Sequence, residues 1–364
     1  AVLHRLGGDR RASEDLLVRA LGTIAPRASR PRLAAEQVQK VAKAMLAGPA
    51  LLHDIAGLTR RQEDIRDRLS DLATFWRLYD DAAAGLTLPI ERAVAGGFAA
   101  DRLGYAFAAG YTEALRQLLP ALGETRAALA ATEAGGVHPR NIHARLEPDG
   151  ENFRLSGDKT FVTLGSYVKT LLVVASQGCD SQGKNRLALC RIPADRPGVL
   201  LRELPPTPFV PEIPHAALQL REVAVAASER LPGDAYERYL KPFRTIEDLH
   251  VHAALLGFVL QLARRLDFAR PLRMELVLLL TAARSLCAAA PEDPAVHIAL
   301  GGLIAGCRRI LGEIAPLWAA ADVTTRTHWE RDRPLLEVAG KARAQRLEVA
   351  WERLTAPPSP RPAA

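Results

Sequence analysis

The hydrophobic periodicity of this sequence changes twice along the chain, and no other feature constrains the fold as much. Between Ser13 and Ala121, apolar residues recur three and four apart, as in an amphipathic helix. From Leu129 to Gly233, short alternating runs separated by turn residues predict β-strands. Long helical patterns then return and favour an antiparallel bundle. The predicted domains are an N-terminal helical domain at 1–126, a middle β domain at 127–233, a C-terminal helical bundle at 234–355 and a disordered tail at 356–364.

Two local patterns make sharper predictions inside these domains. Asp149-Gly150 has the residues of a hairpin turn, and Ser156-Gly157 is expected to form a second turn shortly afterwards. At the start of the C-terminal domain, the letters TIED are typical of a helix start, with Thr245 as the cap and acidic residues in the first turn.

The composition argues for a globular protein that is not exported. The 364 residues carry a net charge of +7, and we find no apolar run of the roughly 20 residues that span a bilayer. The first residues lack the apolar core of a secretory signal, so we expect a cytoplasmic protein that does not bind membranes. The cysteines lie too far apart for a Cys-x-x-Cys motif, and His250 and His252 fall on different helix faces, so no metal site is predicted.

The positive net charge suits an anionic partner. Most Arg residues nevertheless alternate with acidic residues, as in RRQEDIRDRLSD, which is the pattern of a solvated helix face. Nucleic acid is therefore not the favoured partner.

Three motifs follow one another in the β part of the chain. They are TEAGG at Thr132–Gly136, LSGDKTFVTLG at Leu155–Gly165, and a segment that begins with PGVLLRELPP at Pro197 and ends with LPGD at Asp234. In this order they resemble the acyl-CoA dehydrogenases, and the chain is identified as a short, divergent member of that superfamily. The resemblance implies an α+β fold made of an N-terminal α-helical domain, a middle β-barrel or sandwich domain and a C-terminal four-helix bundle.

The resemblance implies FAD as the cofactor and indicates three residues that would hold it. In the family, an aromatic residue packs against the flavin ring and a Thr two positions later donates a hydrogen bond, which corresponds to Phe161 and Thr163. Residues two apart in a strand share a face, so both can meet one ring. Thr132 corresponds to a family Thr that binds the flavin from the preceding loop. The alternatives are a core Phe, a β-branched strand Thr and an ordinary turn.

The residues after the paired glycines depart from the family pattern. Where the family continues with Gly-Ser-Asp, this chain has Val137-His138-Pro139-Arg140, with one residue missing. His138 and Arg140 are candidates to bind a phosphate or carboxylate of a substrate. The alternative is that both are exposed cations of a loop.

The resemblance also indicates a catalytic base. Dehydrogenation of a thioester needs a carboxylate that removes the α proton inside a dry site. Most family members use a Glu after an Arg-Asp pair, but alignment from Arg331-Asp332 to Gly340 puts Ala339 at that position, where its N–H would polarise the thioester carbonyl. The isovaleryl-CoA and long-chain enzymes have Ala or Gly there and carry the Glu where EDLHVHAALLG supplies Glu247. Glu337 is a second, less suitable carboxylate.

These implications form one functional hypothesis with two alternatives. The hypothesis is an FAD-dependent acyl-CoA dehydrogenase of fatty acid metabolism, a homodimer or other homo-oligomer. It would oxidise an acyl-CoA or acyl-carrier thioester and pass electrons to an electron-transfer flavoprotein. The first alternative is a catalytically degenerate relative that serves as a binding or assembly subunit or binds nucleic acid. The second keeps the flavin but reacts with oxygen, as oxidases of this fold do.

Overall fold

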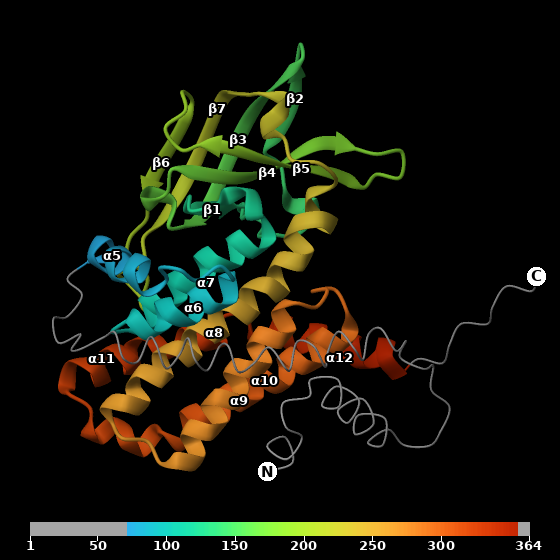
Figure 1. Ribbon diagram of the computed structural model, residues 1–364. Helices are drawn as coiled ribbons and strands as arrows, with labels where there is room; N and C mark the ends of the chain where they lie inside the picture. The colour runs from blue at the N-terminus through green and yellow to red at the C-terminus, as the bar shows by residue number, and fades with distance from the viewer. Residues whose placement is uncertain (1–70, 356–364) are drawn as a thin grey trace, which may run out of the picture.

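The computed structural model describes residues 71–355, in which the sheet lies at one end of the molecule and the helices pack together on one side of it (Figure 1). The helices are α5 (Leu72–Ala82), α6 (Pro89–Ala99), α7 (Leu103–Leu118), α8 (Lys241–Arg265), α9 (Arg270–Cys287), α10 (Pro294–Glu313), α11 (Val323–Asp332) and α12 (Gly340–Thr355). The strands are β1 (Ala127–Ala130), β2 (Arg145–Asp149), β3 (Asn152–Thr163), β4 (Thr170–Cys179), β5 (Asn185–Pro193), β6 (Val199–Glu203) and β7 (His215–Val225). Short segments used below are η2 (Pro139–Asn141), η5 (Tyr236–Leu240) and η7 (Arg333–Glu337). The helices predicted before residue 71 and the predicted tail lie outside the described residues.

The strands form one curled sheet in the order β1-β4-β2-β3-β7-β6, with β5 paired to β4 (Figure 1). β1 and β2 run parallel to β4, whereas β3 pairs antiparallel with both β2 and β7. The run from Leu171 to Ala175 in β4 is fully buried, as expected for a strand covered on both faces. The predicted α+β class, with a β domain between two helical parts, is confirmed. The domain limits at 126 and 233 stay predictions.

One of the two predicted turns is confirmed and the other is wrong. β2 and β3 form a hairpin in which Asp149 pairs with Asn152, and Gly150 in its turn has a φ of +62°. Gly157 lies inside β3, where the register against β7 shifts, so it forms a β-bulge and not a turn. A Cβ at Gly157 would lie 2.5 Å from Ala144 Cα, which explains why glycine is needed at this close approach.

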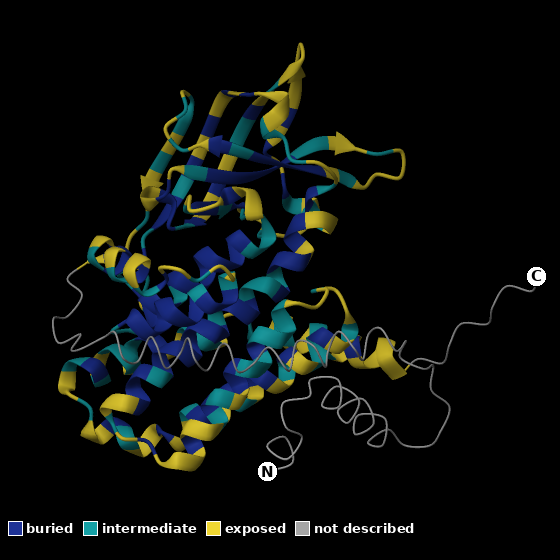
Figure 2. Cartoon of the chain, in the orientation of Figure 1, coloured by how far each residue is buried: buried dark blue, intermediate teal, exposed yellow. Residues whose placement is uncertain are grey.

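Helix α8 starts beside the sheet, runs through the helical part in contact with α6, α7, α9 and α10, and is buried along most of its length (Figures 1 and 2). It packs against α6 and α7, and glycines mark the closest approaches. A Cβ at Gly97 of α6 would overlap the carbonyl oxygen of Ala254, and a Cβ at Gly257 of α8 would overlap that of Val94. The backbones of α6 and α8 are therefore in direct contact, which fixes the position of α8.

Two helices in residues 71–355 are long and apolar enough to cross a membrane by length and composition, contrary to the expectation from apolar runs. The first, Tyr236–Arg265, joins η5 to α8, and 83% of its most apolar window is buried inside the protein. The second, Pro294–Glu313, is α10, and 33% of its window is buried. Apolar residues all around a helix are also typical of a protein core, which accounts for the first of the two.

Candidate functional site

The TEAGG motif forms a tight loop that follows β1 and pairs with the end of β3. Thr132 forms an isolated antiparallel bridge with Phe161, and its carbonyl oxygen accepts a 2.9 Å hydrogen bond from Thr160 N. Glu133 and Gly136 pair across the turn, where Gly136 has a φ of +92°, a conformation that favours glycine. The bridge places two of the three predicted flavin residues, Thr132 and Phe161, side by side.

The Glu of this motif has a structural role that the sequence reasoning missed. Its buried carboxylate accepts hydrogen bonds from His143 N at 2.8 Å and Ala144 N at 3.1 Å, and it forms an ion pair with Lys159 Nζ at 2.6 Å. Lys159 is 1% exposed; burial lowers the pKa of its ammonium group, and Glu133 opposes this effect. The sequence did contain a signal for this ion pair, because Glu133 and Lys159 each belong to one of the three motifs.

Replacing Glu133 with Gln is expected to lower the free energy of unfolding by about 3–5 kcal/mol, because Lys159 would lose its partner inside the protein. The double variant Glu133→Gln/Lys159→Met removes both charges and is expected to recover most of this loss. Urea unfolding followed by circular dichroism compares the three proteins. A single variant as stable as the wild type would show that the ion pair does not hold the loop.

Phe161, Thr163 and His215 lie together on one face of the β3–β7 pair. Thr163 is directly opposite His215 in the antiparallel register, and Phe161 precedes Thr163 by two residues. The rings of Phe161 and His215 stack with centroids 4.2 Å apart and an interplanar angle of 26°. Phe161 remains 39% exposed. It is therefore not a core residue, and it presents an aromatic surface beside the half-buried Thr163.

The His215 imidazole is a buried polar group that the sequence reasoning missed. Burial lowers the pKa of His215 to about 4, so the ring is neutral at pH 7. Its Nδ1 atom is enclosed by the protein and has no hydrogen-bond partner. It lies inside the third motif, but its relation to Phe161 arises only when β7 pairs with β3.

Glu247 lies in the interior of a continuous helix, which corrects the helix start predicted at TIED. The helix begins with η5 at Tyr236 and continues as α8 from Lys241, so Thr245 is a buried interior residue and not a cap. Glu247 is half-buried, and its carboxylate makes no hydrogen bond or ion pair with any residue in 71–355. A role in capping or in countering the helix dipole therefore does not explain this Glu.

The electrostatic surroundings of Glu247 raise its pKa to about 7. Burial is the main cause, the neighbouring Asp248 carboxylate adds to it, and Arg346 and Arg343 oppose it. Burial is also the main cause of the raised pKa of Tyr111, and the charge of Glu247 adds to that effect, so the two side chains are close. A carboxyl group without a partner and with a pKa near 7 has the properties of a general base.

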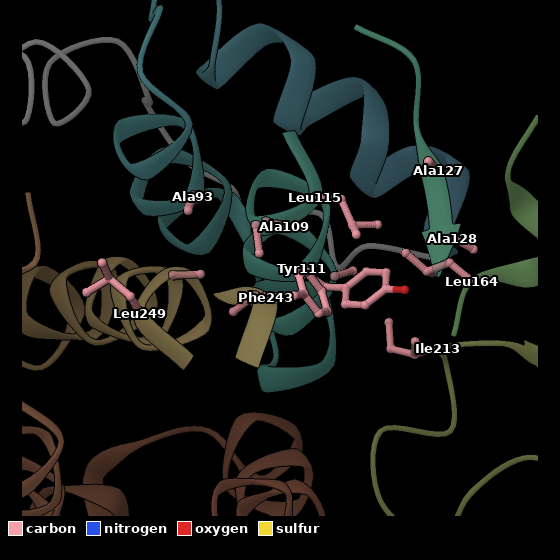
Figure 3. Close-up of a cluster of buried hydrophobic side chains, with 14 of the residues drawn as sticks. Ala93, Ala109, Tyr111, Leu115, Ala127, Ala128, Leu164, Ile213, Phe243 and Leu249 are labelled. Carbon is pink, nitrogen blue, oxygen red and sulfur yellow. The ribbon is translucent and has the colours of Figure 1, made fainter. Parts of the chain in front are cut away.

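Tyr111 connects this carboxyl group to the β domain. Its hydroxyl oxygen accepts a 2.9 Å hydrogen bond from Leu129 N in β1. Figure 3 shows the Tyr111 ring pointing from α7 toward Leu164 and Ile213, which lie next to the ends of β3 and β7. The predicted base and the predicted flavin residues therefore border the same junction between α7, α8 and the sheet.

Ala339 lies in the turn between η7 and α12, and its N–H has no acceptor among the described residues. Arg343 of α12 ties this turn to α8, because it donates to the Leu336 carbonyl oxygen and, at 3.2 Å, to Asp248 Oδ1. The segment with Ala339 is thus held against the part of α8 that carries the predicted base.

The predicted substrate residues His138 and Arg140 lie at an open groove of about 880 Å³ on the β domain. Both are exposed, and His138 Nδ1 accepts a 3.3 Å hydrogen bond from Arg140 N, which shapes η2. Lys184, from the hairpin between β4 and β5, and Glu237, from η5, also line the groove. Glu237 precedes Glu247 by ten residues, so the groove opens roughly 15 Å along the helix from the predicted base.

Within residues 71–355, no group of three or more His, Cys, Asp or Glu side chains could hold a metal ion. The two histidines of α8 instead lie against carbonyl oxygens one turn earlier. His250 Nδ1 is 2.8 Å from Ile246 O, and His252 Nδ1 is 2.6 Å from Asp248 O.

Comparison with known proteins connects this geometry to a family. Residues 128–223 match the family model "Acyl-CoA dehydrogenase, middle domain", and they include the TEAGG loop and the stacked rings. Residues 128–223 therefore form a middle domain of the acyl-CoA dehydrogenase type. This confirms the assignment made from the three motifs.

Two solved structures share the acyl-CoA dehydrogenase fold with this chain. A structure titled "FAD-dependent dehydrogenase" has a TM-score of 0.59 and 14% identity, over 90% of this chain and 99% of that one. The prolyl acyl carrier protein oxidase AnaB has a TM-score of 0.59 and 15% identity, over 88% of this chain and 99% of that one. At these identities the likeness supports the fold.

A curated relative matches only part of the chain. "Probable acyl-CoA dehydrogenase YngJ" of Bacillus subtilis (strain 168) is 27% identical over 128 residues, which are 35% of this chain and 32% of the relative. The match thus spans about a third of the relative's length. It supports membership of the acyl-CoA dehydrogenase superfamily and does not by itself assign an activity.

Proposed function

We propose that this chain is an FAD-dependent oxidoreductase that dehydrogenates an acyl thioester at its α and β carbons. The observation that carries the proposal is Glu247, an interior helix carboxyl group with no partner in residues 71–355 and a pKa of about 7. Such a group is uncommon in a structural role, because a carboxyl group shielded enough to have its pKa raised normally finds hydrogen bonds or an ion pair.

The residues present fit a flavin. Phe161 offers an exposed aromatic surface, and the His215 ring stacks on one face of it. Thr163 and Thr132, which carry hydroxyl groups, lie on the backbone segments beside Phe161. A flat aromatic ligand with polar edges needs this combination of an apolar wall and hydrogen-bond donors. The structural neighbour titled as an FAD-dependent dehydrogenase supports FAD as that ligand. When bound, FAD supplies the acceptor for the hydride that leaves the β carbon.

The chain's own residues supply the remaining chemistry. Glu247, in its carboxylate form, removes the proton from the α carbon, and its raised pKa favours holding that proton afterwards. The free N–H of Ala339 would polarise the thioester carbonyl, which makes the α proton more acidic. Tyr111 and the buried face of α7 exclude water on the side of the β domain.

The groove at η2 is the proposed entrance for the thioester carrier. His138, Arg140 and Lys184 provide positive charge that suits a phosphate group. The charge is mixed, because Lys184 lies 3.9 Å from Glu237 in an ion pair. The groove therefore does not provide the continuous positive surface that nucleic acid needs. It suits a single phosphate group of the molecule that carries the thioester. Both coenzyme A and an acyl carrier protein present such a phosphate, and the neighbour AnaB is titled as an acyl carrier protein oxidase.

One set of experiments tests the proposed function. The purified protein, saturated with FAD, is mixed anaerobically with acyl-CoA and acyl-carrier thioesters of different chain lengths. We expect the flavin absorption band to bleach with at least one thioester, and an electron-transfer flavoprotein to restore it. If oxygen restores the flavin absorption band in place of the electron-transfer flavoprotein, the result would indicate the oxidase alternative. A protein that takes up no FAD and responds to no thioester would contradict the proposal and favour the degenerate binding subunit.

Replacing Asp248 with Asn is expected to move the acidic limb of the pH–rate profile to lower pH. The Asp248 charge raises the pKa of Glu247, whereas Arg343 and Arg346 lower it, so removal of the Asp charge lowers this pKa. Since the base acts as a carboxylate, activity then begins at lower pH. Bleaching rates are measured across the pH range, with Asp267→Asn, an exposed carboxylate beyond the end of α8, as the control. An unchanged acidic limb would contradict the assigned base.

A further inference from the structure

The strand β3 changes its pairing partner at Phe161. Its register against β7 shifts between Lys159 and Val162, and Phe161 instead forms an isolated bridge with Thr132. A residue at such a bulge has lost its cross-strand neighbour, so its side chain must be fixed by other contacts. The His215 ring provides this contact, through the stack with a centroid distance of 4.2 Å.

The two nitrogen atoms of His215 have different surroundings. Nδ1 is enclosed and has no partner. Nε2 is not among the enclosed atoms without a partner, and no residue in 71–355 forms a hydrogen bond with it. Nε2 is therefore the atom through which this imidazole can reach a molecule outside the chain.

The protonation of this ring follows from its burial. The imidazole is neutral at pH 7, since burial disfavours the charged form. A neutral imidazole carries one N–H, and the proton is more stable on the nitrogen that can find an acceptor. His215, which stacks on Phe161 and pairs with Thr163 in the strand register, can thus carry its N–H on Nε2 as a donor.

We propose that His215 is a flavin-binding residue that donates a hydrogen bond from Nε2 to a carbonyl oxygen of the isoalloxazine ring. The inference rests on the proposed function, because it takes the flavin site to be the face shared by Phe161, Thr163 and His215. The same imidazole stacks on one face of the Phe161 ring, so the carbonyl oxygen that Nε2 reaches would lie at the edge of this ring pair. His215 and Thr163 then act as two neutral donors beside one aromatic wall, which suits a flat ligand with carbonyl oxygens on its edge.

The test uses the full chain, stripped of flavin and titrated with FAD. His215→Phe keeps an aromatic ring against Phe161 but lacks the donor, so FAD affinity is expected to fall about tenfold, the effect of leaving one buried carbonyl oxygen without its hydrogen bond. His143→Phe, at an exposed histidine outside this face, is the matched control and is expected to keep wild-type affinity. Thermal unfolding of the flavin-free proteins checks that each variant folds.

A second readout separates a hydrogen bond from a merely structural role. In infrared difference spectra, the flavin carbonyl stretch of the His215→Phe protein is expected at higher frequency than in the wild type, because loss of a donor strengthens the C=O bond. Unchanged FAD affinity and an unchanged carbonyl band would overturn the proposal. A wild-type protein that binds no FAD would overturn both this proposal and the proposed function. A wild-type protein that binds FAD but is not bleached by any thioester would overturn the proposed function and leave the role of His215 standing.

Discussion

Replacing Glu247 with Gln is expected to slow the bleaching of bound flavin by acyl thioesters by about a thousandfold or more. A positioned general base contributes typically about 10²–10⁴-fold, and Gln retains the size of the side chain but cannot accept the α proton. The variant is also expected to keep its FAD and its stability, because Glu247 makes no hydrogen bond or ion pair with residues 71–355 that the substitution would break. The measurement is anaerobic stopped-flow absorbance at saturating thioester.

The control for this variant is Glu337→Gln, at the other carboxylate considered as a base. Glu337 lies at the end of η7, is exposed and forms an ion pair with Arg308 at 2.9 Å, so its replacement should leave the rate close to wild type. In the wild type, the rate should rise with pH through about 7, since Glu247 must lose its proton to act. A Glu247→Gln protein that bleaches at the wild-type rate would exclude Glu247 as the base.

The fold was predictable from the sequence because its strongest signals are local. Periods of two and of three to four residues reflect which face of a strand or helix is buried, and they do not depend on distant partners. The prediction at Ser156-Gly157 was wrong for a related reason. A glycine with positive φ marks both turns and bulges, and only the pairing of β3 with β7, a distant segment, decides between them.

The site was only partly predictable, because its electrostatics depend on contacts between distant segments. Thr132, Phe161 and Thr163 come from motifs, and the structure places them on neighbouring backbone segments. The TIED pattern was misleading, because a short polar sequence that favours a helix start can also lie inside a helix that begins earlier, here at η5. His215 lies in the third motif, but its role was not predictable, because its partner Phe161 is defined by strand register.

The packing of α8 against α6 gives the second large prediction, because it positions the helix that carries the base. Replacing Gly257 with Ala is expected to destabilise the protein by about 3 kcal/mol, although Ala is the better helix former. The added Cβ would overlap the carbonyl oxygen of Val94 and lie 3.0 Å from Phe98 N, so the two helix backbones would have to move apart.

The matched control is Gly302→Ala in α10. Nothing lies within 4 Å of the position of its Cβ, so the same substitution should stabilise the protein by about 0.5–1 kcal/mol through helix propensity. Urea unfolding measures both values, and their opposite signs would separate the steric effect from propensity. If the Gly257→Ala protein were as stable as the wild type, α8 could shift without cost. The position of Glu247 relative to Tyr111 and the β domain would then not be set by the contact between α6 and α8.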